Sequence, residues 1–209
     1  MNTQQSYDQW AEQYDSNLNK TRDLEAVSLR QTLAGFKFKR ALEIGCGTGK
    51  NTEWLQMVSD QLLAVDLSEE MLSIAKAKVS SKNVVFKQAD ITKPWDFADG
   101  LFDLVTFSLV LEHIEDLNPI YENAYRILQP GGRMYIGELH PYKQYTETKA
   151  RFETDQGTQV VTCFTHHLSD FTMGAKSAGF QTELVNEYFD ENVKSGTPRI
   201  LTLLFNKSV

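Results

Sequence analysis

The chain has 209 residues, of which 41% are hydrophobic and 23% are charged, a balance that excludes a disordered or fibrous protein. A chain of this length buries enough surface to hold a core without a disulfide or metal scaffold. Its 21 Lys and Arg residues against 28 Asp and Glu residues give a formal net charge of −7, which disfavours a nucleic-acid partner because such proteins usually carry a basic face.

Residues 1–35 have helical composition and precede the first predicted strand, so we expect a helical cap over the open end of a sheet. Tyr7, Trp10, Ala11 and Tyr14 follow one another at spacings that place them on one helix face. The first residues lack the basic-then-apolar order of a secretory signal. Because no apolar run approaches the roughly 20 residues that span a bilayer, we expect a cytoplasmic protein without a membrane partner.

Short apolar runs then alternate with segments of helical spacing, which indicates βαβ units and a parallel sheet. Neither a repeat nor a linker divides the chain, so we expect one domain. Its predicted parts are the cap over 1–35, a cofactor-binding core over 36–140, and a substrate-side segment with edge strands over 141–209. The predicted strands are 41–44, 62–65, 84–86, 101–107, 134–136, 158–164, 182–188 and 200–205.

Residues that begin and end helices support this order of elements. Ser68 is predicted to cap the helix after the second strand. The sequence Pro130-Gly131-Gly132 is predicted to end a helix and lead into the fifth strand. Ser169 or Asp170 begins a later predicted helix, which Gly179 ends.

The most informative stretch is a glycine-rich turn that directly follows the first predicted strand. Glycine permits tight backbone angles and close approach of a ligand to the main chain, and α/β sheets bind ligands at the carboxyl ends of their strands. A dinucleotide turn, G-x-G-x-x-G, would need glycine at position 50, where this chain has Lys50. A cofactor of another kind is therefore favoured over a merely tight turn. The residues expected to bind it here are Glu43, Gly45, Cys46, Gly47 and Gly49.

Acidic residues end the next two predicted strands. Adjacent parallel strands bring their carboxyl ends together, so Asp66 is expected beside the glycine turn, where its carboxylate can accept from both hydroxyls of a ribose. Asp90 can accept from the exocyclic amine of adenine. A helix N-cap is the less favoured alternative for Asp66 and a solvated turn for Asp90, and their shared position further favours an adenosine site. Its apolar walls are expected to be Leu67, Met71 and Ile91.

Together these motifs resemble those of the class I S-adenosylmethionine-dependent methyltransferases. The resemblance implies a Rossmann-like, seven-stranded, mostly parallel sheet with helices on both faces and an antiparallel final strand. It also implies S-adenosylmethionine as the cofactor and methyl transfer to an oxygen or nitrogen of a small-molecule acceptor. The matching segments are Glu43–Gly49, Asp66, 89–91, 102–105, Ser108–His113, 128–132 and, for the small-molecule branch of the family, 7–15.

The same resemblance gives roles to residues outside the glycine turn. Ser108 and Leu109, in the fourth-strand motif, are expected to contact the cofactor. Aromatic faces are favourable near a sulfonium cation, so Tyr14 is expected either to close over the cofactor or only to pack on the domain. Arg22 can bind the methionyl carboxylate or an acceptor carboxylate, or can remain a solvated charge.

Two histidines are candidate bases. His113 follows the fourth predicted strand and His140 the fifth, although packing roles explain both equally well. An alcohol or protonated amine acceptor needs a base, whereas a phenol, carboxylate or neutral amine needs only positioning. On this view His140→Ala should lower turnover more than cofactor affinity. His166 and His167 are expected in the first turn of the following helix.

Two other functions share parts of this pattern: an NAD-dependent oxidoreductase and a non-catalytic cofactor-binding protein. Lys50 and the lack of a Tyr-x-x-x-Lys pair disfavour the first. The chain also lacks the Asn-Pro-Pro-Tyr and Pro-Cys motifs of methyltransferases that act on bases, which favours a small molecule over nucleic acid. Two cysteines are too few for a zinc cluster, so we expect no metal. The oligomeric state is left open, with a homodimer as one alternative.

Overall fold

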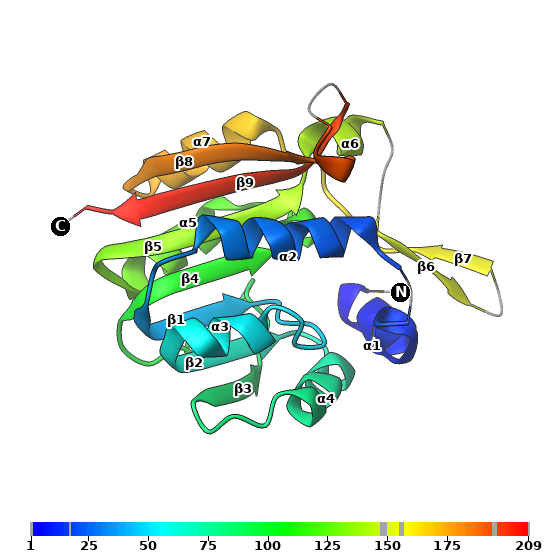
Figure 1. Ribbon diagram of the computed structural model, residues 1–209, viewed down its shortest axis with the longest axis horizontal. Coiled ribbons are helices and arrows are strands. Elements are labelled where there is room, and N and C mark those ends of the chain that lie inside the picture. The colour runs from blue at the N-terminus through cyan, green and yellow to red at the C-terminus, as the bar shows by residue number, and fades with distance from the viewer. Residues whose placement is uncertain (1, 17, 147–149, 155–156, 194–195, 209) are drawn as a thin grey trace.

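The computed structural model describes residues 2–16, 18–146, 150–154, 157–193 and 196–208. Seven strands form one sheet in the order β3-β2-β1-β4-β5-β9-β8 (Figure 1). The strands from β1 to β5 are parallel, and β9 is antiparallel to both of its neighbours. This confirms the expected mostly parallel sheet. The strands are β1 (Phe38–Ile44), β2 (Ser59–Asp66), β3 (Val84–Gln88), β4 (Phe102–Ser108), β5 (Leu128–Leu139), β8 (Phe180–Phe189) and β9 (Pro198–Lys207).

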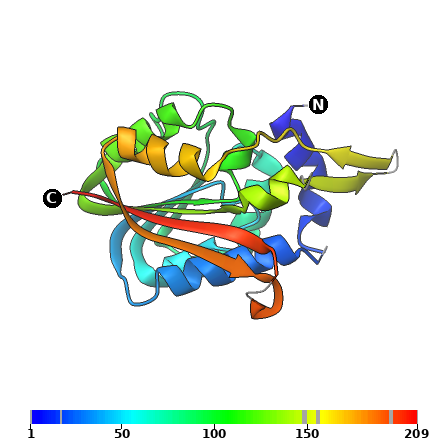
Figure 2. The same cartoon turned by 90° about the horizontal axis from the view of Figure 1, so that it is seen from above.

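Helices cover both faces of the sheet because its central strands are apolar on both sides. In β1, for example, Ala41 faces the core under α2 and α3, whereas Leu42 and Ile44 face the core under α5 and α7. Figure 2 shows α2 and α7 on opposite sides of the sheet. The helices are α1 (Thr3–Tyr14), α2 (Lys20–Thr32), α3 (Thr52–Val58), α4 (Glu69–Lys78), η1 (Leu111–His113), α5 (Asn118–Ile127), α6 (Pro141–Tyr145), α7 (Leu168–Ser177) and η2 (Asp190–Asn192).

The N-terminal cap is divided between two places. Helix α1 lies beyond the carboxyl ends of the strands and contacts α4, as expected (Figure 1). Helix α2 instead packs on the face of the sheet against β5 and β9, which corrects the expectation that all of residues 1–35 lie over the open end. The cause is its apolar side: Ala26, Leu29 and the following Leu33 are buried, and the two leucines belong to the core under this face.

The segment after β5 differs from the prediction at 158–164. Two short strands, β6 (Arg151–Thr154) and β7 (Gly157–Val160), pair with each other and stay outside the main sheet. The N–H of Val161 still donates to the carbonyl of Ala150 across the hairpin, at 2.9 Å, but further along the N–H of Phe164 donates to the carbonyl of Glu112 at 2.7 Å. This bond draws the segment toward the carboxyl end of β4. A single strand over 158–164 is therefore wrong, because its second half bonds to a turn and not to a neighbouring strand.

Most predicted helix boundaries lie close to the observed ones. Ser68 Oγ accepts from the N–H of Met71 at the start of α4, as expected. Helix α7 has His167 as its N-cap, two residues before the earliest predicted cap, and Asp170 accepts from the N–H of His167 at 2.7 Å. Gly179 follows α7 with φ 107°, which suits a helix end. In the part of the chain described here, no helix combines the length and apolarity needed to cross a membrane.

Candidate active site

A cavity of about 360 Å³ opens at the carboxyl ends of β1, β2 and β4, under α1. The topology brings together side chains from five separate segments of the chain there. This agrees with the general position of ligand sites in α/β sheets. Of the predicted site residues, those that line the cavity are Tyr14, Gly45, Asp66, Leu67, Asp90, Ile91, Ser108, Leu109 and His113.

Asp66 ends β2 and presents its carboxylate to this cavity. One oxygen accepts from the N–H of Gly47 at 2.8 Å and the other from the N–H of Ser68 at 2.9 Å. Burial raises the pKa of Asp66, which these backbone hydrogen bonds oppose. A carboxylate has about four acceptor positions, so it retains acceptor capacity for ligand hydroxyls. Ser68, and not Asp66, caps α4, which leaves the side chain of Asp66 directed at the cavity.

The glycine turn after β1 is shaped by its neighbour after β4. Gly45 has φ 69°, and a Cβ built on it would lie 2.1 Å from Cγ2 of Val110. A side chain at position 45 would clash with Val110, so the backbone of the glycine turn packs directly against the Val110 side chain of the turn after β4. Gly45 lines the cavity itself, with Val110 beside it. The local fold therefore requires glycine at position 45 for close approach as well as for backbone angle.

Asp90 and its neighbours form the wall of the cavity next to β3. The Oδ1 atom of Asp90 accepts from the N–H and the hydroxyl of Thr92, at 2.9 and 2.6 Å. Leu67 and Ile91 line the same cavity and supply apolar surface. An acidic group beside two aliphatic side chains suits a flat, polar-edged ring such as adenine.

Four of the predicted cofactor residues lie behind the cavity wall. Glu43 is buried and accepts from Thr52 Oγ1 at 2.6 Å. Cys46 packs with Ala64 and Leu72 of a small core cluster. Gly49 and Met71 likewise do not line the cavity. Met71 is buried, with 1% of its surface exposed.

Glu43 makes the stability of the protein depend on pH. Burial raises the pKa of Glu43 from 4.5 to about 8, so the folded protein holds a proton that the unfolded chain releases. The stabilisation is complete below about pH 4.5 and is lost as the pH rises through about 8. We expect Glu43→Gln to lessen the fall in stability between pH 5 and 8 by at least about 2 kcal/mol, since one pKa unit is worth about 1.4 kcal/mol. Denaturant unfolding at both pH values measures this, and equal falls in both proteins would contradict it.

Aromatic side chains of α1 form the roof of the site. The rings of Trp10 and Tyr14 lie 4.9 Å apart between centroids, and those of Tyr7 and Trp10 5.7 Å apart. Trp10 packs with Tyr7 and Tyr14, as the packing interpretation requires, and both tyrosines also line the cavity. Closure of this helix over a cofactor stays a prediction. The guanidinium carbon of Arg22 lies 4.0 Å from the ring centre of Tyr14. Arg22 itself does not line this cavity.

A second cavity, of about 350 Å³, adjoins the first. Tyr7, Tyr14 and Leu109 line both, so these residues form the boundary between them. Arg22 and the buried Glu112 line the second cavity. The site is thus divided into two compartments that share one aromatic wall. Sequence reasoning did not name Glu112 or Tyr7 as site residues, although both lie in segments that match the family, Ser108–His113 and 7–15.

His113 and His140 occupy different environments. His113 lines the first cavity; its Nδ1 donates to the carbonyl of Thr162 at 2.8 Å, so in the neutral ring Nε2 accepts from the hydroxyl of Tyr7, also at 2.8 Å. His140 caps α6 by accepting from the N–H of Tyr142, and its Nε2 donates to Glu187 at 2.9 Å.

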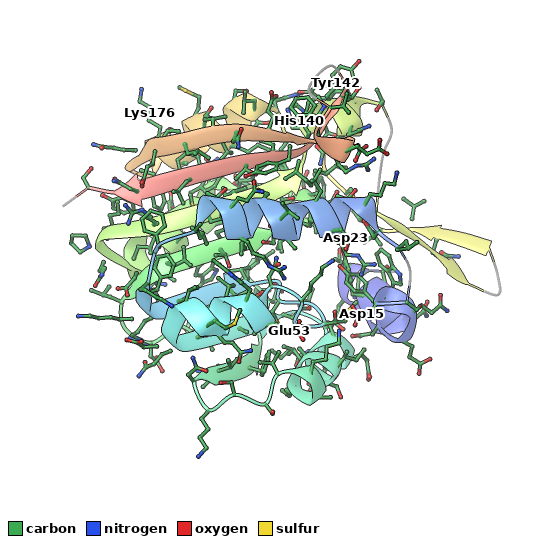
Figure 3. All side chains as sticks on the ribbon, viewed as in Figure 1. Asp15, Asp23, Glu53, His140, Tyr142 and Lys176 are labelled. Carbon is green, nitrogen blue, oxygen red and sulfur yellow. The ribbon has the colours of Figure 1, made fainter. Side chains whose placement is uncertain are left out.

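The position of His140 changes its expected role. His140 lies at the end of β5 beside Tyr142 (Figure 3). It is not among the residues that line either cavity. Both of its ring nitrogens already serve the fold. The geometry therefore favours a capping role for His140, and it leaves His113 as the histidine placed to act as a base.

One cluster of side chains near the cavities has the residue types that bind metal ions. Glu112, His113 and Cys163 each have one ligand atom within 4.8 Å of the others. Both nitrogens of His113 are engaged with Tyr7 and Thr162, however, so a metal would have to displace one of these hydrogen bonds. The donor set does not fit a metal in this conformation.

Comparison with known proteins gives the class of this protein. The family described as "Methyltransferase domain" matches residues 42–136. A "Ubiquinone biosynthesis O-methyltransferase" of Xanthomonas oryzae pv. oryzae is 31% identical over 170 residues, which cover 78% of this chain and 67% of the relative. The chain belongs to the S-adenosylmethionine-dependent methyltransferases. It is an enzyme with S-adenosylmethionine as its cofactor, which excludes the oxidoreductase alternative.

Solved structures of low sequence identity share the fold. The DhpI–SAH complex matches with a TM-score of 0.78 at 23% identity, over 99% of this chain and 95% of that chain. The N-methyltransferase NodS from Bradyrhizobium japonicum WM9, in complex with S-adenosyl-L-homocysteine, matches with a TM-score of 0.74 at 18% identity, over 99% of both chains. Both similarities extend over nearly the whole chain, cap included, and support the fold assignment.

Proposed function

We propose that the first cavity binds S-adenosylmethionine and that the second receives a small-molecule acceptor, which is methylated on oxygen. The observation that carries this proposal is the pair of adjoining cavities with Asp66 at one end and the shared wall of Tyr7, Tyr14 and Leu109 between them. The relative named an O-methyltransferase supports oxygen as the acceptor atom. Nitrogen is the alternative, as in the NodS enzyme.

The residues of the first cavity suit the adenosyl part of this cofactor. Asp66 would accept from the ribose hydroxyls and Asp90 from the adenine amine, while Leu67 and Ile91 would pack on the ring. The bare backbone at Gly45 lets the ligand approach the main chain. The methionyl part would extend past the shared wall to Arg22, which lines the second cavity, so the acceptor would occupy the remainder of that cavity.

When bound, the cofactor supplies a methyl group already activated by a positively charged sulfur. The protein's part is therefore to align the acceptor and exclude water, an effect worth about 7–11 kcal/mol in well-oriented systems. The cap helix α1 covers the site with Tyr7, Trp10 and Tyr14, which suits both tasks. Residues after β5, such as Ala150 and Arg199, line the second cavity and would contact the acceptor.

Tyr7 and His113 offer a route for the acceptor's proton. Burial raises the pKa of Tyr7 well above its usual value, so the phenol stays protonated and passes a proton on without ionising. When the acceptor oxygen takes up the methyl group, its proton would move to the Tyr7 oxygen in the same step in which the Tyr7 proton moves to His113 Nε2, 2.8 Å away, so that the phenol stays neutral and the imidazole ends protonated. The hydrogen bond from Nδ1 to Thr162 holds the ring in place throughout.

His113→Ala is expected to lower turnover of an alcohol acceptor about 10²-fold, as loss of a general base does. The affinity for S-adenosylhomocysteine should fall much less than turnover does, because His113 lines the cofactor cavity but has no assigned hydrogen bond to the cofactor. His140→Ala serves as the matched control and should retain turnover. Single-turnover rates and calorimetric titration measure the two quantities. Wild-type turnover in His113→Ala would show that proton transfer through Tyr7 to His113 is not part of the mechanism.

Incubation with methyl-labelled S-adenosylmethionine and a panel of alcohols, phenols, carboxylic acids and amines tests the proposed reaction. Label on an acceptor oxygen is the expected result. Label on nitrogen would support the alternative acceptor. Binding of the cofactor without transfer to any member of the panel would contradict the proposal that the acceptor belongs to one of these chemical classes.

A further inference from the structure

The turn after β4 has a backbone conformation that the chain does not adopt readily. Leu109 has φ 57°, in the left-handed region that favours glycine. A residue held in such a region stores backbone strain and persists only where its surroundings impose that conformation. The same turn lines the first cavity through Ser108, Leu109 and Val110. A large part of the cavity wall therefore depends on whatever holds this turn.

Glu138 of β5 holds it from behind. Its Oε1 atom accepts from the N–H of Val110 and from the N–H of Leu111, both at 2.8 Å. The residue is 1% exposed, and it is not among those that line the cavity. Successive backbone N–H groups that converge on one oxygen form a nest, which is a strong anchor for an acidic group. A third bond, from the N–H of Leu109 to the carbonyl of Gly137, ties the turn to the adjacent residue of β5.

The position of this turn also matters to the glycine turn after β1. Val110 fills the space that a side chain at position 45 would occupy, with Cγ2 only 2.1 Å from that ideal Cβ position. Movement of Val110 would therefore open or close the cavity at Gly45. Glu138 therefore supports the turn after β4 directly and the glycine turn through Val110, although it does not line the cavity itself.

We propose that Glu138 is a positioning residue that sets the affinity for the adenosyl cofactor by holding the 109–111 turn in its strained form. The inference rests on the proposed cofactor cavity. Without the two hydrogen bonds, Leu109 can relax to ordinary backbone angles, and the wall built on Leu109 and Val110 then loses its shape.

Four variants test this role. Glu138→Leu removes both hydrogen bonds and should weaken binding of S-adenosylhomocysteine at least tenfold. Glu138→Asp withdraws the oxygen by one methylene and should also weaken binding, which provides a test if the leucine variant does not fold. Glu138→Gln retains an oxygen that accepts both bonds, so its affinity should lie within threefold of wild type. Leu203→Ala, a buried change on β9, should lower the melting temperature without changing affinity.

Calorimetric titration gives the affinities. Hydrogen exchange of the Val110 and Leu111 amides in the free protein reports on their two hydrogen bonds to Glu138, which we call the Glu138 clamp. We expect these two amides to exchange at least tenfold faster in Glu138→Leu or Glu138→Asp than in wild type. Wild-type affinity in both of those variants, or an equal loss in Leu203→Ala, would overturn the proposal. Failure of the wild-type protein to bind S-adenosylhomocysteine would overturn the proposed cofactor cavity instead, while the exchange rates would still show whether Glu138 holds the turn.

Discussion

Replacing Asp66 with alanine is expected to weaken binding of S-adenosylhomocysteine at least tenfold. In the proposed complex the Asp66 carboxylate accepts from the ribose hydroxyls, and charge-assisted hydrogen bonds contribute about 1.5–3 kcal/mol each. Loss of one such bond already corresponds to about a tenfold change in affinity. The substitution also removes the acceptor for the N–H groups of Gly47 and Ser68, which shape the glycine turn and the start of α4. Calorimetric titration measures the loss.

Asp60→Ala is the matched control, because Asp60 is an exposed acid near the amino end of the same strand. It makes the same change of charge at the opposite end of β2 from the cavity and should leave affinity unchanged. Asp66→Asn should fall between wild type and alanine, since one of its two terminal side-chain atoms, Oδ1, remains an acceptor. Unchanged affinity in Asp66→Ala would show that the ribose does not bind to the Asp66 carboxylate.

Gly45→Ala is expected to have the second large effect, on stability and on affinity together. The new Cβ would lie 2.1 Å from Cγ2 of Val110, and φ 69° is unfavourable for alanine. The left-handed conformation alone costs about 1–2 kcal/mol. The clash adds to that and forces the two turns apart at the cavity. We expect a clear fall in melting temperature and at least a tenfold loss of S-adenosylhomocysteine affinity.

Gly35→Ala separates the two causes. Gly35 has a similar φ of 85°, but nothing lies within 4 Å of its ideal Cβ position. It therefore measures the cost of the backbone angle alone and should keep full affinity. A Gly45→Ala protein that binds as tightly as Gly35→Ala would show that close contact between the turns is not required for the site.

Much of the sheet could be predicted from local patterns because its strands are buried on both faces. The runs at 41–44 and 62–65 lie within β1 and β2 as observed, and Asp66 follows directly at the cavity. The hairpin of β6 and β7 could not be separated from a sheet strand in this way. The bonds that end it, such as the one from Phe164 to Glu112, join residues distant in sequence.

The candidate site was predictable only where it follows the strand ends. Asp66, Asp90 and Gly45 line the cavity because topology places strand ends together. Glu43 carries the same sequence signal, yet its side chain turns to Thr52 behind the wall. The direction of a side chain depends on its partners across the fold, which no local pattern contains. The clamp formed by Glu138 is of the same kind, since its partners lie 27 and 28 residues away in the chain.

A crystal structure of the protein with S-adenosylhomocysteine would show directly whether the first cavity is the cofactor site. We expect the ribose hydroxyls on the Asp66 carboxylate, the adenine between Leu67 and Ile91 with its amine toward Asp90, and the sulfur directed at the wall formed by Tyr7, Tyr14 and Leu109. A ligand bound elsewhere, or one bound here with Asp66 and Asp90 turned away from it, would show that this cavity is not the site.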